Sequence, residues 1–465
     1  MGIVTNRRIR LGAGAGFAGD RIDPARDLAE RGELDYLIFE CLGERTVAAG
    51  QAQRLRDPNT GYDPLLAARM RAVLAPVLAA GTTVVTNSGS ANPLAAAEVV
   101  ADCVRDLGVQ GPEGRPVRIA TVTGDDVLAA VRTRDPVVWE TGRRLSEHSE
   151  ELVSANAYLG SDAVLPALAR RPDVVLTGRL ADPALYLAPL LHEFGWGWTD
   201  HVRLGAGTAI GHLLECAGQL TGGYYADPGT KPVDDLAFLG FPFAEVAEDG
   251  TAEFGKLDGT GGLLTARTCA EQLLYEVGDP AAYLTPDVTA DFRDVRFREI
   301  GPNRVAIEGA TGRARPNELK VTLGFRGGWL GEGQISYAGP RALGRARLAA
   351  EVVTRRLVAL HGVEQDAVTV EFIGAGAAFR GLVPIDEDGT VGGVDLPEVR
   401  LRVSATVGDR ATAEAIGWEV EGLYTNGPAG GGGARRSTTE VLAVRSCLLP
   451  RELVHPEVHI MDVAL

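Results

Sequence analysis

The segment RIRLGAGAGFAGDRIDPARDLAERGELDYLIFE, residues 8–40, decides the fold class. It leads from a short apolar stretch through a glycine-rich loop and a helical segment to a second apolar stretch. The helical segment has clear end signals, because Asp23 and Pro24 are typical of a helix start and Gly32 of a helix end. A strand, a helix and a second strand in this order predict a βαβ unit with parallel strands.

The same alternation recurs as far as about residue 285. Short runs rich in Val, Ile and Leu are each followed by a small or polar loop and an Ala/Leu-rich helical segment. The predicted strands are 8–11, 34–40, 82–86, 118–123 and 173–177. Buried strands that alternate with helices are typical of a mostly parallel sheet flanked by helices, so we predict an α/β domain over residues 1–288.

The pattern changes after about residue 290. Strand-like stretches there alternate with two long helical segments, and the strand-like stretches are 304–308, 318–325, 367–373 and 399–405. The helical segments are 340–361 and 411–425. We therefore predict a smaller α+β domain over residues 289–465, ending in a glycine-rich loop and C-terminal strands.

Composition excludes several classes of partner. The 465 residues include 46 basic and 62 acidic side chains, which give a net charge of −16, so nucleic acid and an anionic membrane would be repelled. Five cysteines without a CxxC pair indicate a reducing compartment. Neither a signal-peptide core nor about 18 consecutive apolar residues is present, so we expect a cytoplasmic protein that does not enter a membrane.

Polar residues follow each predicted parallel strand. In open α/β sheets, ligands bind beyond the carboxyl ends of the strands, where these loops gather. We predict Glu40 as a catalytic residue there, and Arg179 or Arg21 as a clamp for a substrate carboxylate. The substrate-binding candidates in these loops are Gly14, Gly16, Asp20, Arg21, Asn87, Ser88, Asn92, Arg179 and Asp182. The alternative is that these residues only form turns and helix caps.

Residues 205–220 are predicted to form a helix with an unusual polar face. At about 100° per residue, His212, Glu215, Cys216 and Gln219 fall on one side of it. His212, Glu215 and Cys216 are therefore catalytic candidates for acid–base chemistry, and Gln219 a substrate-binding candidate. The alternatives are a solvated outer face and, because the His–Glu spacing occurs in helical metal sites, a metal site; we predict no metal.

Glycine is unusually frequent, with 59 residues. Its clusters at 12–19, 205–211, 222–223, 259–262 and 430–433 are expected to bring backbone N–H groups close to a small anionic ligand. The binding candidates from the later clusters are Gly222, Gly223, Asn426, Gly431 and Gly432.

The glycines at 14, 16 and 19 also match the GxGxxG dinucleotide fingerprint, with Glu40 beyond them. The predicted helix starts only at Asp23, after the glycines, whereas a dinucleotide-binding helix begins within the motif. Nucleotide dependence therefore remains an alternative, and no P-loop, GxSxG or HExxH motif occurs in the sequence.

Several blocks together resemble the acyclic terpene utilisation (AtuA-like) family, formerly a domain of unknown function. They include RLGAGAGFAGDR, LDYLIFECLGERTV, TNSGSANP, GHLLECAGQLTGGYY and EGLYTNGPAGGGG. The resemblance covers nearly the whole chain, which lacks the extra C-terminal domain of some longer members. It implies a bacterial enzyme of branched-chain or terpenoid carboxylate catabolism, associated with acyl-CoA carboxylation, and it assigns no catalytic roles.

We expect an enzyme that acts on a small anionic organic acid or its CoA thioester by a hydratase or lyase type of acid–base reaction. No cofactor is predicted, apart from CoA as part of the substrate. We also expect a homo-oligomer. The alternatives are a non-enzymatic acyl-binding or scaffold subunit that partners an acyl-CoA carboxylase, and a nucleotide-dependent enzyme.

Overall fold

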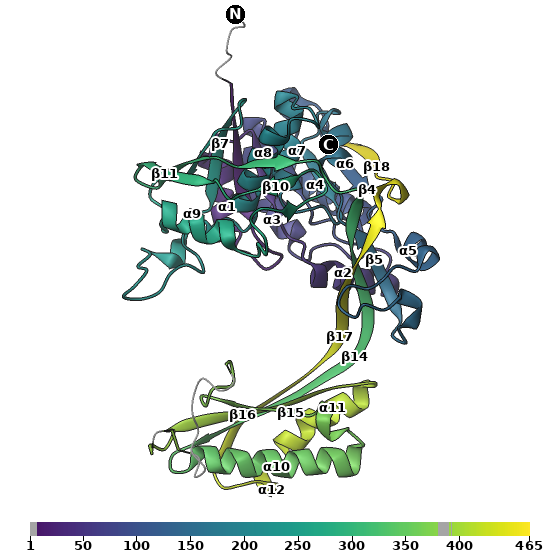
Figure 1. Ribbon diagram of the computed structural model, residues 1–465, viewed down its shortest axis with the longest axis vertical. Helices are drawn as coiled ribbons and strands as arrows, with labels where there is room; N and C mark the ends of the chain where they lie inside the picture. The colour runs from purple at the N-terminus through teal and green to yellow at the C-terminus, as the bar shows by residue number, and fades with distance from the viewer. Residues whose placement is uncertain (1–6, 380–389, 392) are drawn as a thin grey trace, which may run out of the picture. The chain divides into compact units, whose positions relative to one another are not determined.

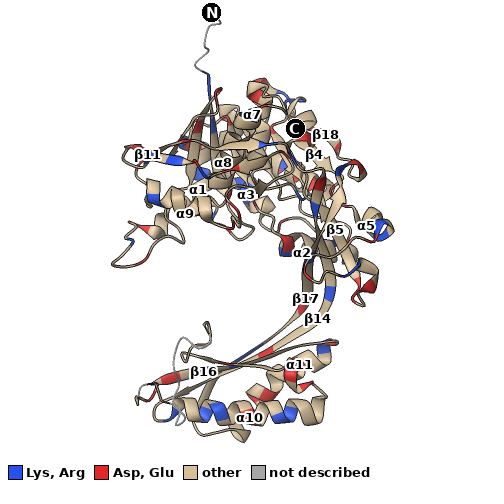
Figure 2. Cartoon of the chain, viewed as in Figure 1, with Lys and Arg blue, Asp and Glu red and all other residues tan. Residues whose placement is uncertain are grey.

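The computed structural model describes residues 7–379, 390–391 and 393–465. The chain forms two compact units, one of residues 1–324 and 444–465 and the other of residues 325–443. Figure 1 shows their helices and strands, and Figure 2 shows that acidic and basic residues are interspersed along both units.

The first unit is built on a ten-stranded sheet. Its centre is a parallel block in the order β1 (Arg8–Ala15), β2 (Tyr36–Phe39), β3 (Thr83–Thr86), β6 (Val174–Thr177) and β4 (Val117–Thr123). Antiparallel strands extend it beyond β1 with β7 (Pro242–Ala247), β8 (Ala252–Lys256), β12 (Arg304–Glu308) and β11 (Arg296–Gly301), and beyond β4 with β18 (Glu457–Val463).

Two helical layers bury the parallel strands. One layer contains α1 (Asp23–Arg31), α3 (Leu66–Ala80) and α4 (Pro93–Leu107), and the other contains α6 (Ser161–Leu168), α7 (Ala184–Phe194) and α8 (His201–Glu215). All four residues of β2 are buried because both faces of the strand are covered. The predicted α/β class with a smaller second part is therefore confirmed, and each of the five predicted parallel strands is present.

The remaining elements of the first unit surround this core. They are α2 (Glu44–Arg56), α5 (Leu128–Arg134), α9 (Ala266–Leu274), β5 (Leu152–Ala157), and the small sheet of β9 (Tyr283–Leu284), β10 (Thr289–Asp291) and β13 (Thr311–Arg313). The small sheet packs against α8 through β10 and β13. Helix α8 is consequently buried along almost its whole length from Leu204 onward.

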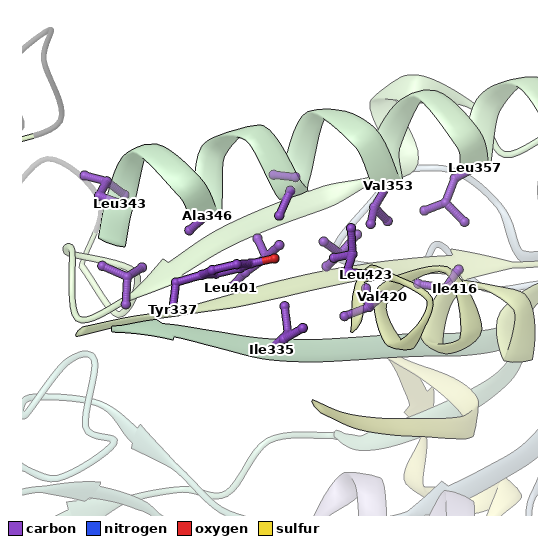
Figure 3. Close-up of a cluster of buried hydrophobic side chains, with 14 of the residues drawn as sticks. Ile335, Tyr337, Leu343, Ala346, Val353, Leu357, Leu401, Ile416, Val420 and Leu423 are labelled. Atoms are coloured by element: carbon purple, nitrogen blue, oxygen red, sulfur yellow. The ribbon is translucent and has the colours of Figure 1, made fainter. Parts of the chain in front are cut away.

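The second unit is an antiparallel sheet with helices on one face. Its strands are in the order β15 (Thr369–Ile373), β16 (Glu398–Val407), β14 (Glu318–Ala338) and β17 (Gly431–Pro450). The helices are α10 (Ala342–His361), α11 (Arg410–Glu421) and α12 (Leu423–Asn426). Figure 3 shows its core, in which Leu343 and Val353 of α10 face Leu401 of β16 and Val420 of α11.

The division into units differs from the predicted boundary at residues 288/289. Residues 289–324 and 444–465 belong to the first unit. The physical reason is strand pairing, since β11 and β12 extend the large sheet at one edge and β18 pairs with β4 at the other. No α-helix lies between β11 and β12, and the α-helices that directly precede β18 in the chain belong to the second unit, so no strand–helix alternation marks these strands as part of the α/β sheet.

Among the helices in the described parts of the chain, none combines the length and the apolar composition needed to cross a bilayer.

Candidate functional site

A cleft of about 680 Å³ opens at the carboxyl ends of the parallel strands in the first unit. Loops after β1, β2 and β6 line it together with the end of α8. These segments contribute Gly16, Phe17, Ala18, Asp20, Arg21, Glu40, Leu42, Gly43, Glu44, Thr46, Asp182, Glu215, Cys216, Gly218 and Gln219. The other lining residues are Gly223, Tyr224, Leu236, Leu239, Phe241, Tyr275 and Glu276. A ligand site is expected in this place for a sheet of this type.

Glu40 follows β2 directly and is held by two N–H donors. Its Oε1 accepts from the backbone N–H of Leu42 at 2.7 Å and from Nδ2 of Asn87 at 2.9 Å. Asn87 is itself oriented, because its Oδ1 accepts the N–H of Cys41 at 2.7 Å. Burial, reinforced by nearby Asp182, raises the pKa of Glu40 to about 8. At neutral pH the carboxyl is therefore mostly protonated, and its proton belongs on Oε2, because Oε1 already accepts two N–H groups.

Glu215, the last residue of α8, forms a pair with His212. The imidazole Nδ1 lies 2.8 Å from Oε1 of Glu215, and Nε2 lies 3.2 Å from the carbonyl oxygen of Leu273. A carbonyl can only accept, so Nε2 carries a hydrogen and the second proton of the pair lies between Nδ1 and Oε1. Burial raises the pKa of Glu215 to about 7. Oε2 of Glu215 is buried without a hydrogen-bond partner.

Asp182 is a third carboxyl of the cleft; its side chain is half-buried, and Arg179 holds it. The Arg179 guanidinium donates to Asp182 and to the carbonyl oxygen of Leu42, and it lies 4.2 Å from the centre of the Tyr158 ring. Burial raises the pKa of Asp182 although the guanidinium opposes that shift. Because Arg179 is almost fully buried and both of its terminal nitrogens bind protein oxygens, it orders the cleft instead of reaching into it.

Glu40 and Glu215 lie close enough to act on the same neighbours. Apart from burial, the charges of both carboxyls raise the pKa of the Tyr186 phenol and of the Cys216 thiol. Asp182 likewise raises the pKa of both glutamates. The three carboxyl groups therefore share one buried region, where each disfavours ionisation of the others.

The outer part of the cleft is also acidic. Asp20 accepts the N–H groups of Gly16 and Arg21, each at 2.8 Å, and Glu44 accepts from the Tyr158 hydroxyl and from Nζ of Lys320, the latter at 3.0 Å. Arg21 is the single Arg or Lys among the described residues that line the cleft. Its Nη1 already donates to the carbonyl oxygens of Leu236 and Ala237 at 2.9 and 3.0 Å.

A buried ion pair fixes the loop after β1. Arg69 of α3 is paired with Asp63, and both are almost completely inaccessible. Nη2 of Arg69 donates to the carbonyl oxygen of Ala18 at 2.7 Å. A charge pair in the interior thus anchors one wall of the cleft.

Apolar side chains also line the cleft, and together they are called its apolar wall. They are Phe17, Leu236, Leu239, Phe241 and the rings of Tyr224 and Tyr275. Phe17 and Tyr224 are 60% and 88% exposed, which is unusual for aromatic residues and leaves their surface available to a ligand. The cleft therefore combines a carboxyl-lined interior with an apolar wall.

Nine residues predicted from the sequence line this cleft together. They are Gly16, Asp20, Arg21, Glu40, Asp182, Glu215, Cys216, Gln219 and Gly223. His212, Asn87 and Arg179 lie behind the lining and hold Glu215, Glu40 and Asp182 in place. His212 is buried against Tyr283 and Phe292, whose rings lie 5.1 and 5.9 Å from the imidazole, so the solvated outer face considered for this helix is wrong.

The other predicted residues have structural environments elsewhere. Ser88 donates to Asp63 at 3.3 Å, and Asn92 caps α4 and binds the carbonyl oxygens of Pro58 and Thr60. Gly14 lies within β1 against the Phe39 ring, and Gly222 packs against Val233. Asn426, Gly431 and Gly432 belong to the second unit, where Asn426 ends α12 and the two glycines begin β17.

The glycines of α8 do not approach a ligand. A Cβ at Gly205, Gly207 or Gly211 would overlap Thr311, Leu187 or Pro183, so these glycines allow close packing of α8. The expectation of an anion site at 205–211 is wrong for this reason. Gly16 also serves close packing, since a Cβ there would lie 2.7 Å from Cα of Cys216.

The GxGxxG match lacks the geometry of a dinucleotide site. Gly14 is inside the strand, Gly16 abuts Cys216, and α1 begins only at Asp23. Within the described residues, no group of three or more His, Cys, Asp or Glu side chains is arranged to hold a metal ion.

Sequence reasoning missed Tyr224, Tyr275, Glu276, Leu239 and Phe241. They lie in loops next to the antiparallel strands. Sequence spacing does not predict that residues in such loops reach the cleft. The TGGYY block around Tyr224 was the available signal, but only its glycines were considered.

Comparisons with known proteins give one match over most of the chain. The family described as "Acyclic terpene utilisation family protein AtuA" matches residues 9–460. The search of curated proteins gave no match. A crystal structure described as that of a "putative oxidoreductase" from Parabacteroides merdae is 8% identical, covers 61% of this chain and 70% of its own, and has a TM-score of 0.10, so it carries no argument.

Proposed function

The chain belongs to the acyclic terpene utilisation family AtuA, and we propose that it is an acid–base enzyme of hydratase or lyase type. Its substrate in this proposal is a branched or terpenoid acyl group in an uncharged form such as a thioester. The observation that carries the proposal is the cluster of Glu40, Asp182 and Glu215 in one cleft, two buried carboxyls and one half-buried carboxyl, all with raised pKa values. Carboxyl groups that lie in a cleft and have pKa values shifted towards neutral pH are typical of acid–base catalysis.

The charges around the cleft favour the thioester over the free acid. Six carboxyl groups line it, those of Asp20, Glu40, Glu44, Asp182, Glu215 and Glu276, against the one guanidinium of Arg21. The expected carboxylate clamp by Arg179 has no free terminal nitrogen to make it. A protonated Glu40 would instead donate a hydrogen bond to a neutral carbonyl oxygen, and the apolar wall would take the hydrocarbon chain.

The two glutamates take complementary roles in this proposal. Glu40, protonated on Oε2, donates to the carbonyl oxygen as it acquires enolate character, which stabilises the developing charge. Glu215 uses its unpartnered Oε2 to accept the proton of the water that adds to the double bond. Oε1 meanwhile keeps its hydrogen bond to Nδ1 of His212, and Oε2 returns its proton to the α carbon to complete hydration; dehydration is the reverse.

The alternative is a non-enzymatic acyl-binding or scaffold subunit for an acyl-CoA carboxylase. A polar segment 212–219 open to solvent would favour it. Glu215, Cys216, Gly218 and Gln219 instead line one cleft with the strand-end loops, which supports the enzyme.

Purified protein assayed with branched enoyl and hydroxyacyl thioesters, and in parallel with the free acids, tests the proposal. We expect turnover of the thioesters and at least about tenfold lower kcat/KM for the acids, because an uncompensated carboxylate in an acidic cleft is disfavoured. Unchanged turnover in both His212→Ala and Glu215→Ala would remove the assigned roles.

A further inference from the structure

A second cavity, of about 260 Å³, adjoins the cleft in the first unit. Gln219, Gly223, Tyr224 and Tyr275 line both cavities. The residues that line only the second cavity are Tyr225, Thr268, Glu271, Gln272 and Leu274. A ligand that reaches from the cleft past the shared residues therefore enters this second cavity.

The second cavity differs from the cleft in charge. Glu271 is its single charged lining residue among those described, and the Glu271 carboxylate is paired with Nζ of Lys231. Lys231 also lies 4.8 Å from the centre of the Tyr225 ring. With that charge compensated, the cavity suits an uncharged ligand group, whereas the cleft is lined by carboxyls.

The polar groups of the second cavity are amides and hydroxyls. Gln219 and Gln272 supply amide groups, and Nε2 of Gln272 is fixed by donating to the carbonyl oxygen of His212 at 3.3 Å. An amide side chain offers both donors and an acceptor, which matches the two sides of another amide. The cavity therefore offers hydrogen-bond donors and acceptors that complement those of a ligand chain containing amide groups.

Tyr224 stands at the junction of the two cavities in a strained conformation. Its φ is +61°, which a bulky side chain rarely adopts, and its ring lies 6.2 Å from that of Tyr275 in an edge-on arrangement. Gly223 before it permits this path, because a Cβ there would lie 2.8 Å from the carbonyl oxygen of Gly218. Strained residues of this kind are concentrated at ligand sites.

We propose that the second cavity binds the uncharged, amide-bearing arm of the thioester, the chemistry of pantetheine, while the acyl carbonyl lies beside Glu40 and Glu215. This inference rests on the proposed function. The acyl chain occupies the part of the apolar wall formed by Phe17, Leu239 and Phe241, so the arm on the sulfur side leaves towards Gln219 and Tyr224. Its amides pair with Gln219 and Gln272, and its methylene groups pack on the Tyr224 and Tyr275 rings.

Calorimetric binding of pantetheine to the full-length protein tests this subsite. We expect Gln219→Met and Tyr224→Asn each to weaken binding about tenfold, the size of one lost amide or aromatic contact. Asparagine tolerates a positive φ, so that variant leaves the backbone unstrained. Phe238→Ala is the matched control, since Phe238 is exposed but lines neither cavity, and it should bind as the wild type does.

Equal pantetheine affinity in the wild type, both variants and the control would overturn the subsite. A second measurement compares acyl thioesters of pantetheine with those of N-acetylcysteamine, which lacks the outer amide. Gln272 lines only the second cavity, so the outer amide lies at Gln272. Gln272→Met should therefore raise the KM of the pantetheine thioester about tenfold relative to that of the shorter one, and an equal change for both would also overturn the subsite. If pantetheine binds as expected while Glu40→Gln retains full turnover, the proposed function fails and the subsite stands.

Discussion

Nδ1 of His212 lies 2.8 Å from Oε1 of Glu215, while Nε2 of the same ring faces the carbonyl oxygen of Leu273 at 3.2 Å. The ring is thereby fixed in orientation, and the pair holds a proton that moves between an imidazole and a carboxyl. Oε2 of Glu215 is buried and has no partner, so the pair has one unfilled hydrogen-bonding position in a residue that lines the cleft. The predictions below follow from this arrangement and from the groups around it.

Replacing His212 by Asn should alter the pH profile as well as the rate. His212 lowers the pKa of Glu215, against the larger effect of burial. Without the imidazole, Glu215 should ionise at a higher pH. The rise of kcat with increasing pH should therefore shift to a higher pH, and the maximal kcat should fall by about 100-fold. A pH–rate series on both proteins measures this. A uniform loss with an unmoved profile would show that His212 only supports the fold.

The wild-type pH–rate profile should be bell-shaped around neutrality. Glu215, with a pKa of about 7, must be ionised to act as the base, so activity rises as pH passes that value. Glu40, with a pKa of about 8, must be protonated to act as the acid, so activity falls as pH passes it. A profile that stays flat through both values contradicts these two roles.

The raised pKa of Glu40 should also make the folded protein sensitive to alkali. A carboxyl with a folded pKa of about 8 and an unfolded value near 4.5 contributes stability that is full below the lower value and is lost as pH rises through the upper one. Glu40→Gln removes this titration. Its free energy of unfolding in urea should therefore fall less than that of the wild type between these two pH values, and parallel falls would contradict the assignment.

Gly16 and Gly43 give a matched pair for testing the shape of the cleft. Both line it, but a Cβ at Gly16 would lie 2.7 Å from Cα of Cys216, whereas one at Gly43 would meet only Oγ1 of Thr46, at 4.0 Å. Gly16→Ala should force the loop away from α8 and cost about 1–3 kcal/mol in stability. Gly43→Ala should change the midpoint of urea unfolding little. Equal effects of the two substitutions would mean that the contact between the loop and α8 is not tight.

The buried Arg69–Asp63 ion pair should stabilise the fold only while both charged partners are present. Arg69→Met leaves the Asp63 carboxylate buried without its partner and should cost about 3–5 kcal/mol. Adding Asp63→Asn removes the stranded charge and should recover part of that loss. Urea unfolding of the single and double variants measures both values. A double variant less stable than Arg69→Met alone would contradict this interpretation.

The parallel core could be predicted from the sequence because its strands are buried on both faces. Residues 36–39 and 174–176 are continuous apolar runs, and they lie in β2 and β6. The antiparallel edges could not be predicted in the same way. The chain after residue 288 returns to the first sheet through β11, β12 and β18, and such long-range pairing leaves no local signal.

The site was predictable where the topology determines the place of a residue. Glu40 and Asp182 follow parallel strands, so they gather at one edge of the sheet. The environment of His212 was not predictable, because Tyr283 and Phe292 cover it from a distant part of the chain. The helix also ends at Glu215 instead of continuing to residue 220, so Gln219 reaches the cleft from a separate turn.

The turnover number of Glu40→Gln with a branched enoyl thioester tests the central claim most directly. Glutamine keeps the size of the side chain and an oxygen to accept from Leu42, but it has no acidic proton to give. We predict a loss of about 10³-fold in kcat, with stability at neutral pH no lower than that of the wild type. Glu30→Gln, on the exposed side of α1, should keep full activity as a control. A kcat for Glu40→Gln within about twofold of the wild type would contradict the role of Glu40 as the acid. Such a small change in rate corresponds to a negligible change in activation free energy.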